Sequence, residues 1–203
     1  MSLGRGLFIT FEGPDGSGKT VQVELLGEAL AADEPLLVRE PGGTPLGEEI
    51  RSLLLHSARM NPAAEMYLFM AARAELLSER ILPALASGRT VIADRYHDST
   101  IAYQGGGREI DAEWPPHFPR PDLTVLIELS AAVGQERMRL AGKALDRLDA
   151  ESMDFHRRVE RAYDRMAAEE PDRFLRVDGG ESAVEIHRRV LGRVQGMLAG
   201  RPA

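Results

Sequence analysis

The chain has 203 residues, of which 43% are hydrophobic and 28% are charged, as in an ordinary globular domain. Its formal net charge of −7 argues against a general nucleic-acid binder, which needs a basic surface to attract phosphate groups. The sequence has no cysteine, which excludes disulfides and thiolate metal sites, and it has no apolar run long enough to cross a membrane. A short apolar stretch near the start leads directly into a glycine-rich turn, so we expect no export signal and a cytoplasmic location.

Five short apolar runs have the length of buried strands, and segments with helical patterns separate them. They cover residues 6–12, 35–40, 90–95, 123–129 and 173–178. Continuous apolar strands that alternate with helices indicate a parallel sheet covered by helices on both faces. We therefore expect one α/β domain over residues 1–203, with a five-stranded parallel sheet and right-handed crossovers.

The helical segments carry recognisable starts and stops. A first amphipathic pattern covers 19–32. Thr44 followed by Pro45 predicts the N-cap and first residue of a second helix. The pattern over 63–87 is long, and we expect this helix to bend or stop near Pro83.

Near the C-terminus, Ser182 and Glu185 have the spacing of a capping box. We expect an amphipathic helix to follow them and to end at about Leu198.

Basic residues concentrate between Gln135 and Arg147. This stretch holds Arg137, Arg139, Lys143 and Arg147 but only two acidic residues. A solvated helix face is the ordinary explanation of such a cluster, so it gains a function only if another motif requires one.

The stretch FEGPDGSGKT, residues 11–20, follows the first predicted strand and opens the first predicted helix. It fits the phosphate-loop pattern G-x-x-x-x-G-K-[ST] in the context that this pattern requires. Glycines let backbone N–H groups close around phosphate oxygens, and the helix N-terminus adds partial positive charge. Lys19 would reach the β- and γ-phosphates, and the Thr20 hydroxyl is a ligand for Mg²⁺. The residues predicted to bind a nucleoside triphosphate are Gly13, Pro14, Asp15, Gly16, Ser17, Gly18, Lys19 and Thr20.

Charged residues also follow the second and third predicted strands. Asp94 and Arg95 stand at the end of the third, and REPGGT, residues 39–44, follows the second. Ligands of open parallel sheets bind at this edge, where Asp94 suits the Mg²⁺ shell and Arg95 suits an acceptor phosphate. A single Asp–Arg or Arg–Glu pair is as readily a structural ion pair, but groups at successive strand ends favour a second anion site. The pattern predicts a kinase whose acceptor is itself phosphorylated.

Other phosphate-loop proteins fit this sequence less well. A GTPase needs N-K-x-D to read its base, and the sequence lacks this motif. A nucleic-acid translocase is usually larger and has a basic surface that follows a backbone. A nucleotide-binding regulator without a small acceptor would leave Arg39, Arg73 and Arg95 without a role. A kinase with a different nucleotide acceptor stays open and would differ in acceptor preference.

Together the motifs resemble the thymidylate kinase family of nucleoside monophosphate kinases. The matching stretches, between Phe11 and Tyr163, are FEGPDGSGKT, REPGGT, AAR ending at Arg73, DRYHDSTIAYQGG, LDRLDAES and DFHRRVERAY. The resemblance implies a P-loop NTPase fold and transfer of the γ-phosphoryl group of MgATP to dTMP, giving dTDP and ADP in dTTP biosynthesis. It also implies a homodimer formed through the apolar helix around 66–77, with neither nucleic acid nor a membrane as partner.

The resemblance also assigns acceptor-binding roles. Asp15 matches the residue that contacts the deoxyribose 3′-hydroxyl, and Arg39 and Arg95 match arginines near the acceptor phosphate. Phe69 resembles the ring that stacks on thymine, although an aromatic residue on an apolar helix is as often part of the core. Arg73 matches the residue that bonds a thymine carbonyl. The other nucleoside-binding positions implied in this way are Ser99, Thr100, Tyr103 and Gln104.

In the same family a mobile lid covers the phosphates, and residues of about 137–149 resemble it. The interior of the phosphate loop, 14–17, has no basic residue, so the cation that stabilises the transferring phosphoryl group is expected from the lid. Arg147 is the first candidate, followed by Arg139 and Lys143. The predicted catalytic residues are therefore Lys19, Arg95, Arg147, Arg139 and Lys143. This lid has fewer arginines than many, which leaves the choice within it open.

Overall fold

The computed structural model describes residues 5–57, 59–142 and 146–200. Its strands are β1 (Phe8–Glu12), β2 (Leu36–Arg39), β3 (Val91–Asp94), β4 (Leu123–Glu128) and β5 (Phe174–Asp178). They form one sheet in the order β2-β3-β1-β4-β5, and every neighbouring pair is parallel. The predicted α/β class with a five-stranded parallel sheet is confirmed, and each strand lies inside the range expected for it.

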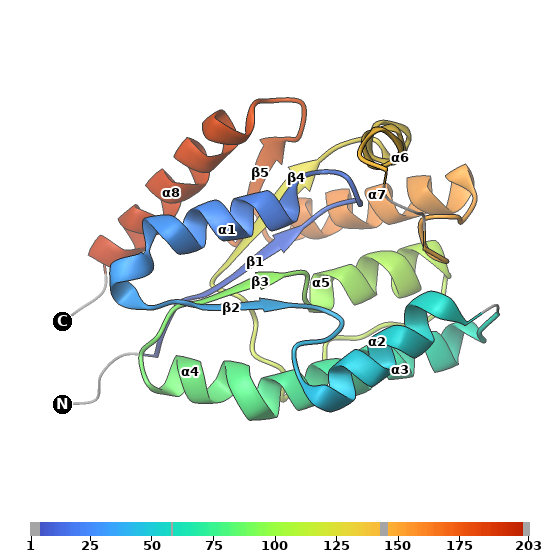
Figure 1. Cartoon of the computed structure of the whole chain (residues 1–203), viewed down its shortest axis with the longest axis horizontal. Coiled ribbons are helices and arrows are strands. Elements are labelled where there is room, and N and C mark those ends of the chain that lie inside the picture. Colours follow the sequence, from blue (N-terminus) through green and yellow to red (C-terminus); the bar gives the residue numbers. More distant parts are fainter. Residues whose placement is uncertain (1–4, 58, 143–145, 201–203) are drawn as a thin grey trace.

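Helices cover both faces of this sheet (Figure 1). Their bounds are α1 (Lys19–Ala29), η1 (Ala31–Asp33), α2 (Pro45–His56), α3 (Pro62–Leu76), η2 (Leu77–Ile81), α4 (Leu82–Ala86), α5 (His97–Thr100), η3 (Ile101–Gly107), α6 (Ala131–Leu140), α7 (Met153–Glu169) and α8 (Ala183–Ala199). Helices α1 and α8 pack on one face, and α3, α4 and α7 pack on the other.

Buried apolar side chains of β1 divide between the two faces because successive residues of a strand point in opposite directions. Ile9 and Phe11 pack with side chains of α1 and α8. Phe8 packs with residues of η2 and α4 on the opposite face. All five residues of the central strand are therefore buried, as in a parallel sheet covered on both faces.

The predicted helix starts are confirmed. The Thr44 side chain accepts a hydrogen bond from the Gly47 backbone N–H at 3.0 Å. Ser182 and Glu185 form a reciprocal capping box at the start of α8. The helical path over 62–86 does not stop at Pro83; instead the π-helical turn η2 stands just before it. A proline lacks the N–H donor that a continuous α-helix would use, and the wider turn accommodates this loss.

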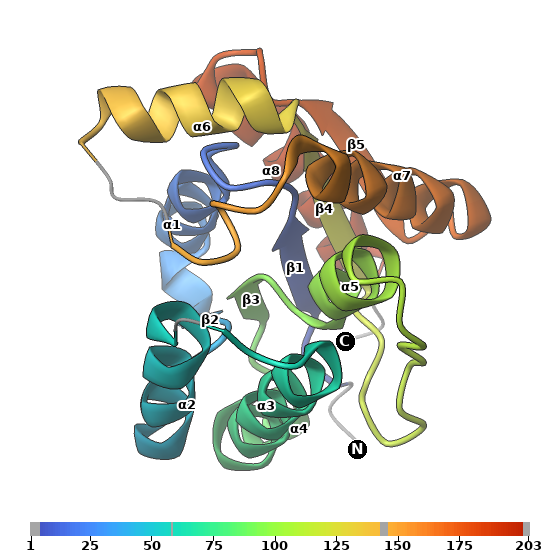
Figure 2. The same cartoon turned by 90° about the vertical axis from the view of Figure 1, so that its right-hand side faces the viewer.

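The loops that follow β1, β2 and β3 all leave the carboxyl edge of the sheet (Figure 2). Since these three strands are neighbours, the glycine-rich turn, residues 39–44 and Arg95 meet at that edge. Within the described residues, no helix combines the length and apolar character needed to cross a membrane.

Candidate active site

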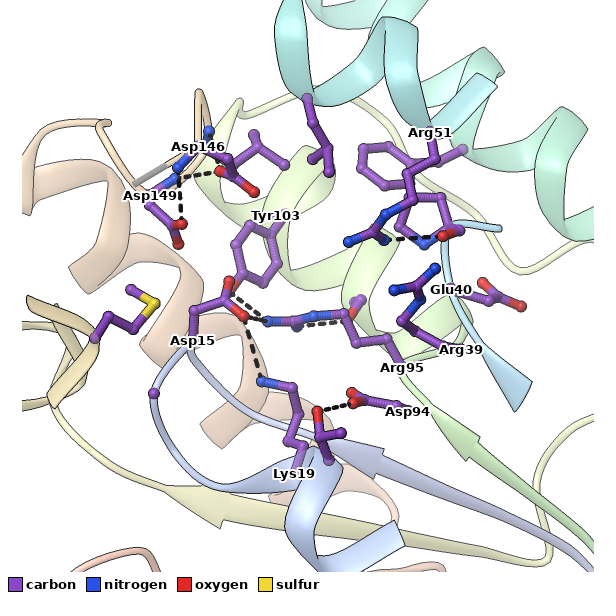
Figure 3. A pocket seen from close by; sticks show the side chains of 18 of the residues that line it. Asp15, Lys19, Arg39, Glu40, Arg51, Asp94, Arg95, Tyr103, Asp146 and Asp149 are labelled. Atoms are coloured by element: carbon purple, nitrogen blue, oxygen red, sulfur yellow. Dashed lines mark hydrogen bonds and ion pairs between the residues drawn. The ribbon is translucent and has the colours of Figure 1, made fainter. Parts of the chain in front are cut away.

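A cavity of about 710 Å³ opens at this edge of the sheet (Figure 3). The predicted residues that line it are Asp15, Gly16, Gly18, Lys19, Thr20, Arg39, Phe69, Asp94, Arg95, Ser99, Thr100, Tyr103 and Gln104. The predicted residues outside its wall are Gly13, Pro14, Ser17, Arg73, Arg139 and Arg147, and Lys143 lies outside the described residues. The fold thus brings most donor-side and acceptor-side candidates into one space.

The backbone of the glycine-rich turn requires glycine for two reasons. Gly13 and Gly16 have φ angles of 134° and 75°, which side chains rarely allow. A Cβ on Gly16 would also lie 2.3 Å from the Gly134 carbonyl oxygen, because the first turn of α6 packs directly on the loop. The loop is therefore held between β1 and α6 with its backbone bare.

Lys19, the first residue of α1, extends its amine back over this turn. Its Nζ donates hydrogen bonds to the carbonyl oxygens of Gly13 at 3.1 Å and Pro14 at 2.8 Å. Burial and the charge of Arg95 lower its pKa, opposed by the nearby carboxylates. The carbonyl oxygens of Gly13 and Pro14 thus hold the Lys19 amine at the mouth of the loop, where a bound phosphate group would lie.

Thr20 and Asp94 present two oxygen atoms to each other across the cavity floor. The Thr20 hydroxyl donates to Asp94 Oδ2 at 2.6 Å, joining the start of α1 to the end of β3. Among the described residues, no group of three or more His, Asp and Glu side chains is placed to hold a metal ion. Mg²⁺ typically takes one or two protein oxygens and completes its shell with water and substrate phosphates, so this pair fits it.

Arg95 is directed into the cavity by three neighbours. It donates from Nη1 to Ser99 Oγ at 3.0 Å, and from Nη2 to Asp15 Oδ1 at 3.0 Å and to the Tyr103 hydroxyl at 3.4 Å. Burial alone would raise the pKa of Asp15, but the charges of Arg95 and Lys19 outweigh it and hold that pKa below its usual value. Asp15 is therefore a carboxylate shared by two cations.

Two arginines approach the cavity from the side of β2 and α2. Arg39 pairs with Glu48 at 3.2 Å on the exposed rim. Arg51, which the sequence analysis missed, lines the cavity and donates to the Pro41 carbonyl oxygen at 2.9 Å. Arg51 follows Ile50 on the buried face of α2, directly after the REPGGT motif. A basic residue at the border of that face was the signal that could have identified it.

The two residues expected to read the base differ in position. Phe69 lines the cavity from α3 and also packs against the apolar clusters beside it. Arg73 is 1% exposed and lies behind the wall. It donates to Glu40 Oε2 at 2.7 Å and to Thr100 Oγ1 at 2.9 Å. Arg73 therefore reaches the cavity through two lining residues and does not enter the lining itself.

The lid candidates are also spread apart. Arg139 is exposed and pairs with Glu136 at 2.7 Å. Arg147 donates to Glu65 Oε2 at 2.5 Å, away from the cavity wall. Arg137, a member of the same basic stretch, does line the cavity, and its Nη1 donates to the Gly179 carbonyl oxygen at 2.9 Å. Arg137 lines the cavity and Arg139 does not because residues two positions apart point to different sides of α6.

Two acidic residues of the lid segment line the cavity and were not predicted (Figure 3). Asp146 Oδ1 accepts hydrogen bonds from the backbone N–H groups of Leu148 and Asp149, which forms a tight turn. Burial and the nearby carboxylates of Asp15 and Asp146 raise the pKa of Asp149 to about 7. The turn therefore places a carboxyl group that titrates near neutrality beside Asp15.

The parallel sheet, the glycine-rich loop between β1 and α1, and the lysine at the start of α1 together define a P-loop nucleotide-binding enzyme. A family model described as thymidylate kinase matches residues 11–190. A thymidylate kinase from Halothermothrix orenii is 46% identical, covering 96% of this chain and 99% of the relative. One from Thermomicrobium roseum is 48% identical over 84% of this chain and 86% of the relative. The chain belongs to the thymidylate kinase family.

Solved structures agree with this assignment. The crystal structure of thymidylate kinase from Ehrlichia chaffeensis superposes with a TM-score of 0.75 at 32% sequence identity. The match covers 94% of this chain and 99% of the Ehrlichia chaffeensis chain. The family resemblance, the fold and the kinase activity predicted from the sequence are therefore confirmed.

Proposed function

We propose that this cavity binds MgATP and dTMP together and transfers the γ-phosphoryl group between them, giving ADP and dTDP. One observation carries the proposal. Lys19 Nζ lies 3.7 Å and Arg95 Nη2 lies 3.0 Å from the same oxygen, Asp15 Oδ1. Lys19 of the ATP-binding loop and Arg95 of the acceptor side thus meet at the Asp15 carboxylate. The γ-phosphate of ATP and the phosphate of dTMP would be neighbours at this point.

On the donor side, the backbone of residues 13–18 and the Lys19 amine would hold the phosphates, because N–H groups at a helix N-terminus bind anions. Thr20 and Asp94 are the oxygen donors for Mg²⁺. Bound there, the ion would neutralise charge on the phosphate oxygens.

On the acceptor side, Arg39, Arg51 and Arg95 supply positive charge for the dTMP phosphate. Asp15 would accept a hydrogen bond from the 3′-hydroxyl, and the volume of Tyr103 beside it would exclude a 2′-hydroxyl. The thymine ring would stack on Phe69, which is half-buried and lines the cavity. The polar contacts of the base would come from Thr100 and Gln104, which line the cavity. Arg73 would act indirectly, by orienting Glu40 and Thr100 from behind the wall.

The remaining requirement is a cation for the charge that develops during transfer. We assign it to the lid, with Arg147 first and Arg139 and Lys143 next. Arg147 now pairs with Glu65, so the assignment requires it to exchange that carboxylate for the phosphoryl group when the lid closes. Closure would also exclude water and limit ATP hydrolysis.

We further propose that the enzyme is a cytoplasmic homodimer acting in dTTP biosynthesis. Two neighbouring helices expose apolar side chains: Leu53 of α2 is 53% exposed and Tyr67 of α3 is 66% exposed. A second copy of the chain that covers α2 and α3 would bury both. Sedimentation equilibrium of the wild type and of Tyr67→Glu tests the dimer, which the charged residue should dissociate.

The reaction is tested by ADP release from MgATP with dTMP, dUMP, dCMP, dGMP, AMP or no acceptor. We expect strong stimulation by dTMP, weaker stimulation by dUMP and little by the others. The dUMP difference should be partial, because one methyl group in an apolar pocket is worth only about 1–3 kcal/mol. Stimulation by a different nucleotide would refute the base-reading residues, and no stimulation at all would indicate a nucleotide-binding regulator.

A further inference from the structure

Glu12, the last residue of β1, is a fully buried carboxyl group that lies outside the cavity wall. It accepts three hydrogen bonds. The Tyr96 backbone N–H donates to Oε1 at 2.8 Å, and the hydroxyls of Ser99 and Tyr163 donate to Oε2 at 2.5 Å and 2.8 Å. Burying a carboxyl group is costly, and the three donors offset that cost. The residues that carry these donors therefore indicate which part of the structure Glu12 stabilises.

The first of these bonds fixes a strained backbone. Arg95 has a φ of 71°, a left-handed conformation that is unfavourable for a residue with a side chain. The bonds on either side of it hold this turn in place. The Arg95 N–H donates to the Phe11 carbonyl oxygen at 3.0 Å, and the next N–H, that of Tyr96, donates to Glu12. Together they clamp the two peptide units that determine where the Arg95 side chain leaves the sheet.

The second bond orients the other end of the same side chain. A serine hydroxyl has one hydrogen, and Ser99 gives it to Glu12. Its lone pairs are then free to accept from Arg95 Nη1, which lies 3.0 Å away. Glu12 therefore controls both the backbone of Arg95 and, through Ser99, its guanidinium.

We infer that Glu12 is a positioning residue that sets Arg95 in advance for the phosphate of the acceptor nucleotide. This inference rests on the proposed function, in which Arg95 meets that phosphate. Glu12 does not touch substrate; it acts by holding a cation in one orientation, which lowers the ordering cost that acceptor binding would otherwise carry.

The test is Glu12→Gln, which keeps the shape of the side chain. A glutamine amide has one acceptor oxygen and one NH2 group, so it cannot accept both from the Tyr96 N–H at one position and from the two hydroxyls at the other. We expect the KM for dTMP to rise about tenfold, because a buried partner of Glu12 loses its hydrogen bond. Affinity for a fluorescent ATP analogue, which reports on the Lys19 loop, should stay within about twofold.

A matched control separates positioning from general damage. Asp98 is equally buried, and its carboxylate binds Arg173 and Thr124 without a hydrogen bond to Arg95 or Ser99 in the part of the chain that the structure describes. Asp98→Asn should lower the melting temperature as Glu12→Gln does but leave the KM for dTMP near the wild-type value. An equal rise in that KM for both variants would overturn the inference.

A double-mutant cycle with Arg95→Ala completes the test. If Glu12 acts through Arg95, the KM for dTMP of the double variant should equal that of Arg95→Ala alone; multiplicative effects would overturn the inference. If Arg95→Ala itself leaves this KM unchanged, the proposed function of Arg95 is wrong, which is a distinguishable failure. Should Glu12→Gln not fold, Glu12→Asp decides, because it keeps the charge but shortens the reach to Ser99. A wild-type KM for that variant would refute the positioning role.

Discussion

Arg73 Nη1 lies 3.2 Å from His97 Nδ1, and His97 Nε2 lies 3.0 Å from the Glu113 carbonyl oxygen. Because a guanidinium only donates, Nδ1 must accept, and the imidazole proton must sit on Nε2. Burial and the charge of Arg73 lower the pKa of His97 to about 3. His97 is therefore a neutral acceptor that fixes Arg73 behind the cavity wall.

The first prediction concerns stability against pH. The pKa of His97 falls from its usual 6.5 to about 3 on folding, so the unfolded chain binds an extra proton below pH 6.5. This contribution to the free energy of unfolding is complete above that pH and is lost as the pH falls, by up to about 1.4 kcal/mol per pH unit. His97→Gln, whose amide can accept from Arg73 and donate to Glu113, should show a shallower loss. Urea unfolding of both proteins between about pH 6 and pH 4 measures the difference. Parallel curves would show that His97 is not the group responsible.

The second prediction concerns Lys19, which we expect to be essential for transfer but not for folding. Lys19→Ala removes the cation at the loop mouth and should lower kcat on the order of a hundredfold to a thousandfold. The hydrogen bonds to the carbonyl oxygens of Gly13 and Pro14 are also lost, but they involve the loop alone and no side chain of the apolar core. Single-turnover formation of ADP and the circular dichroism melting temperature test the two parts separately. Near-normal turnover would refute the assignment.

The third prediction concerns Arg51, found only in the structure. Arg51→Ala should raise the KM for dTMP by about tenfold or more, because a charged hydrogen bond to phosphate is worth about 1.5–3 kcal/mol. Steady-state kinetics with varied dTMP at saturating MgATP measure it. Arg189→Ala is the matched control, since this arginine of α8 pairs with Glu181 and neither residue lines the cavity. An unchanged KM for Arg51→Ala would place the acceptor phosphate elsewhere.

The fourth prediction tests whether Arg147 acts in the transition state. Arg147→Ala should lower kcat on the order of a hundredfold and change the KM for dTMP by less than about threefold. Arg108 is the matched control because it pairs with the same carboxylate, Glu65, at 3.0 Å without lining the cavity. Arg108→Ala should keep most of kcat. Similar losses in both variants would mean that Arg147 anchors the lid on Glu65, and a pure KM effect would mean ground-state binding.

Much of the fold was predictable because its signals are local. The pattern of a glycine loop between an apolar strand and a helix spans about ten residues, so the positions of Lys19 and Thr20 at the start of α1 could be predicted without coordinates. The same holds for the N-cap Thr44 and the capping box at Ser182, whose partners lie three residues away. Asp94 and Arg95 were predictable because the ends of parallel strands share one edge.

The sequence by itself therefore determined the class of enzyme, the sheet and the glycine-rich loop after its first strand. Only the tertiary structure decided which charged side chains enter the cavity and which are held by other residues. Arg147 pairs with Glu65, Arg73 pairs with Glu40, and Glu12 binds Tyr163, across 82, 33 and 151 positions of the chain. Such pairs depend on how helices pack on the sheet. The sequence alone does not distinguish an arginine that binds a substrate from one that a buried glutamate neutralises.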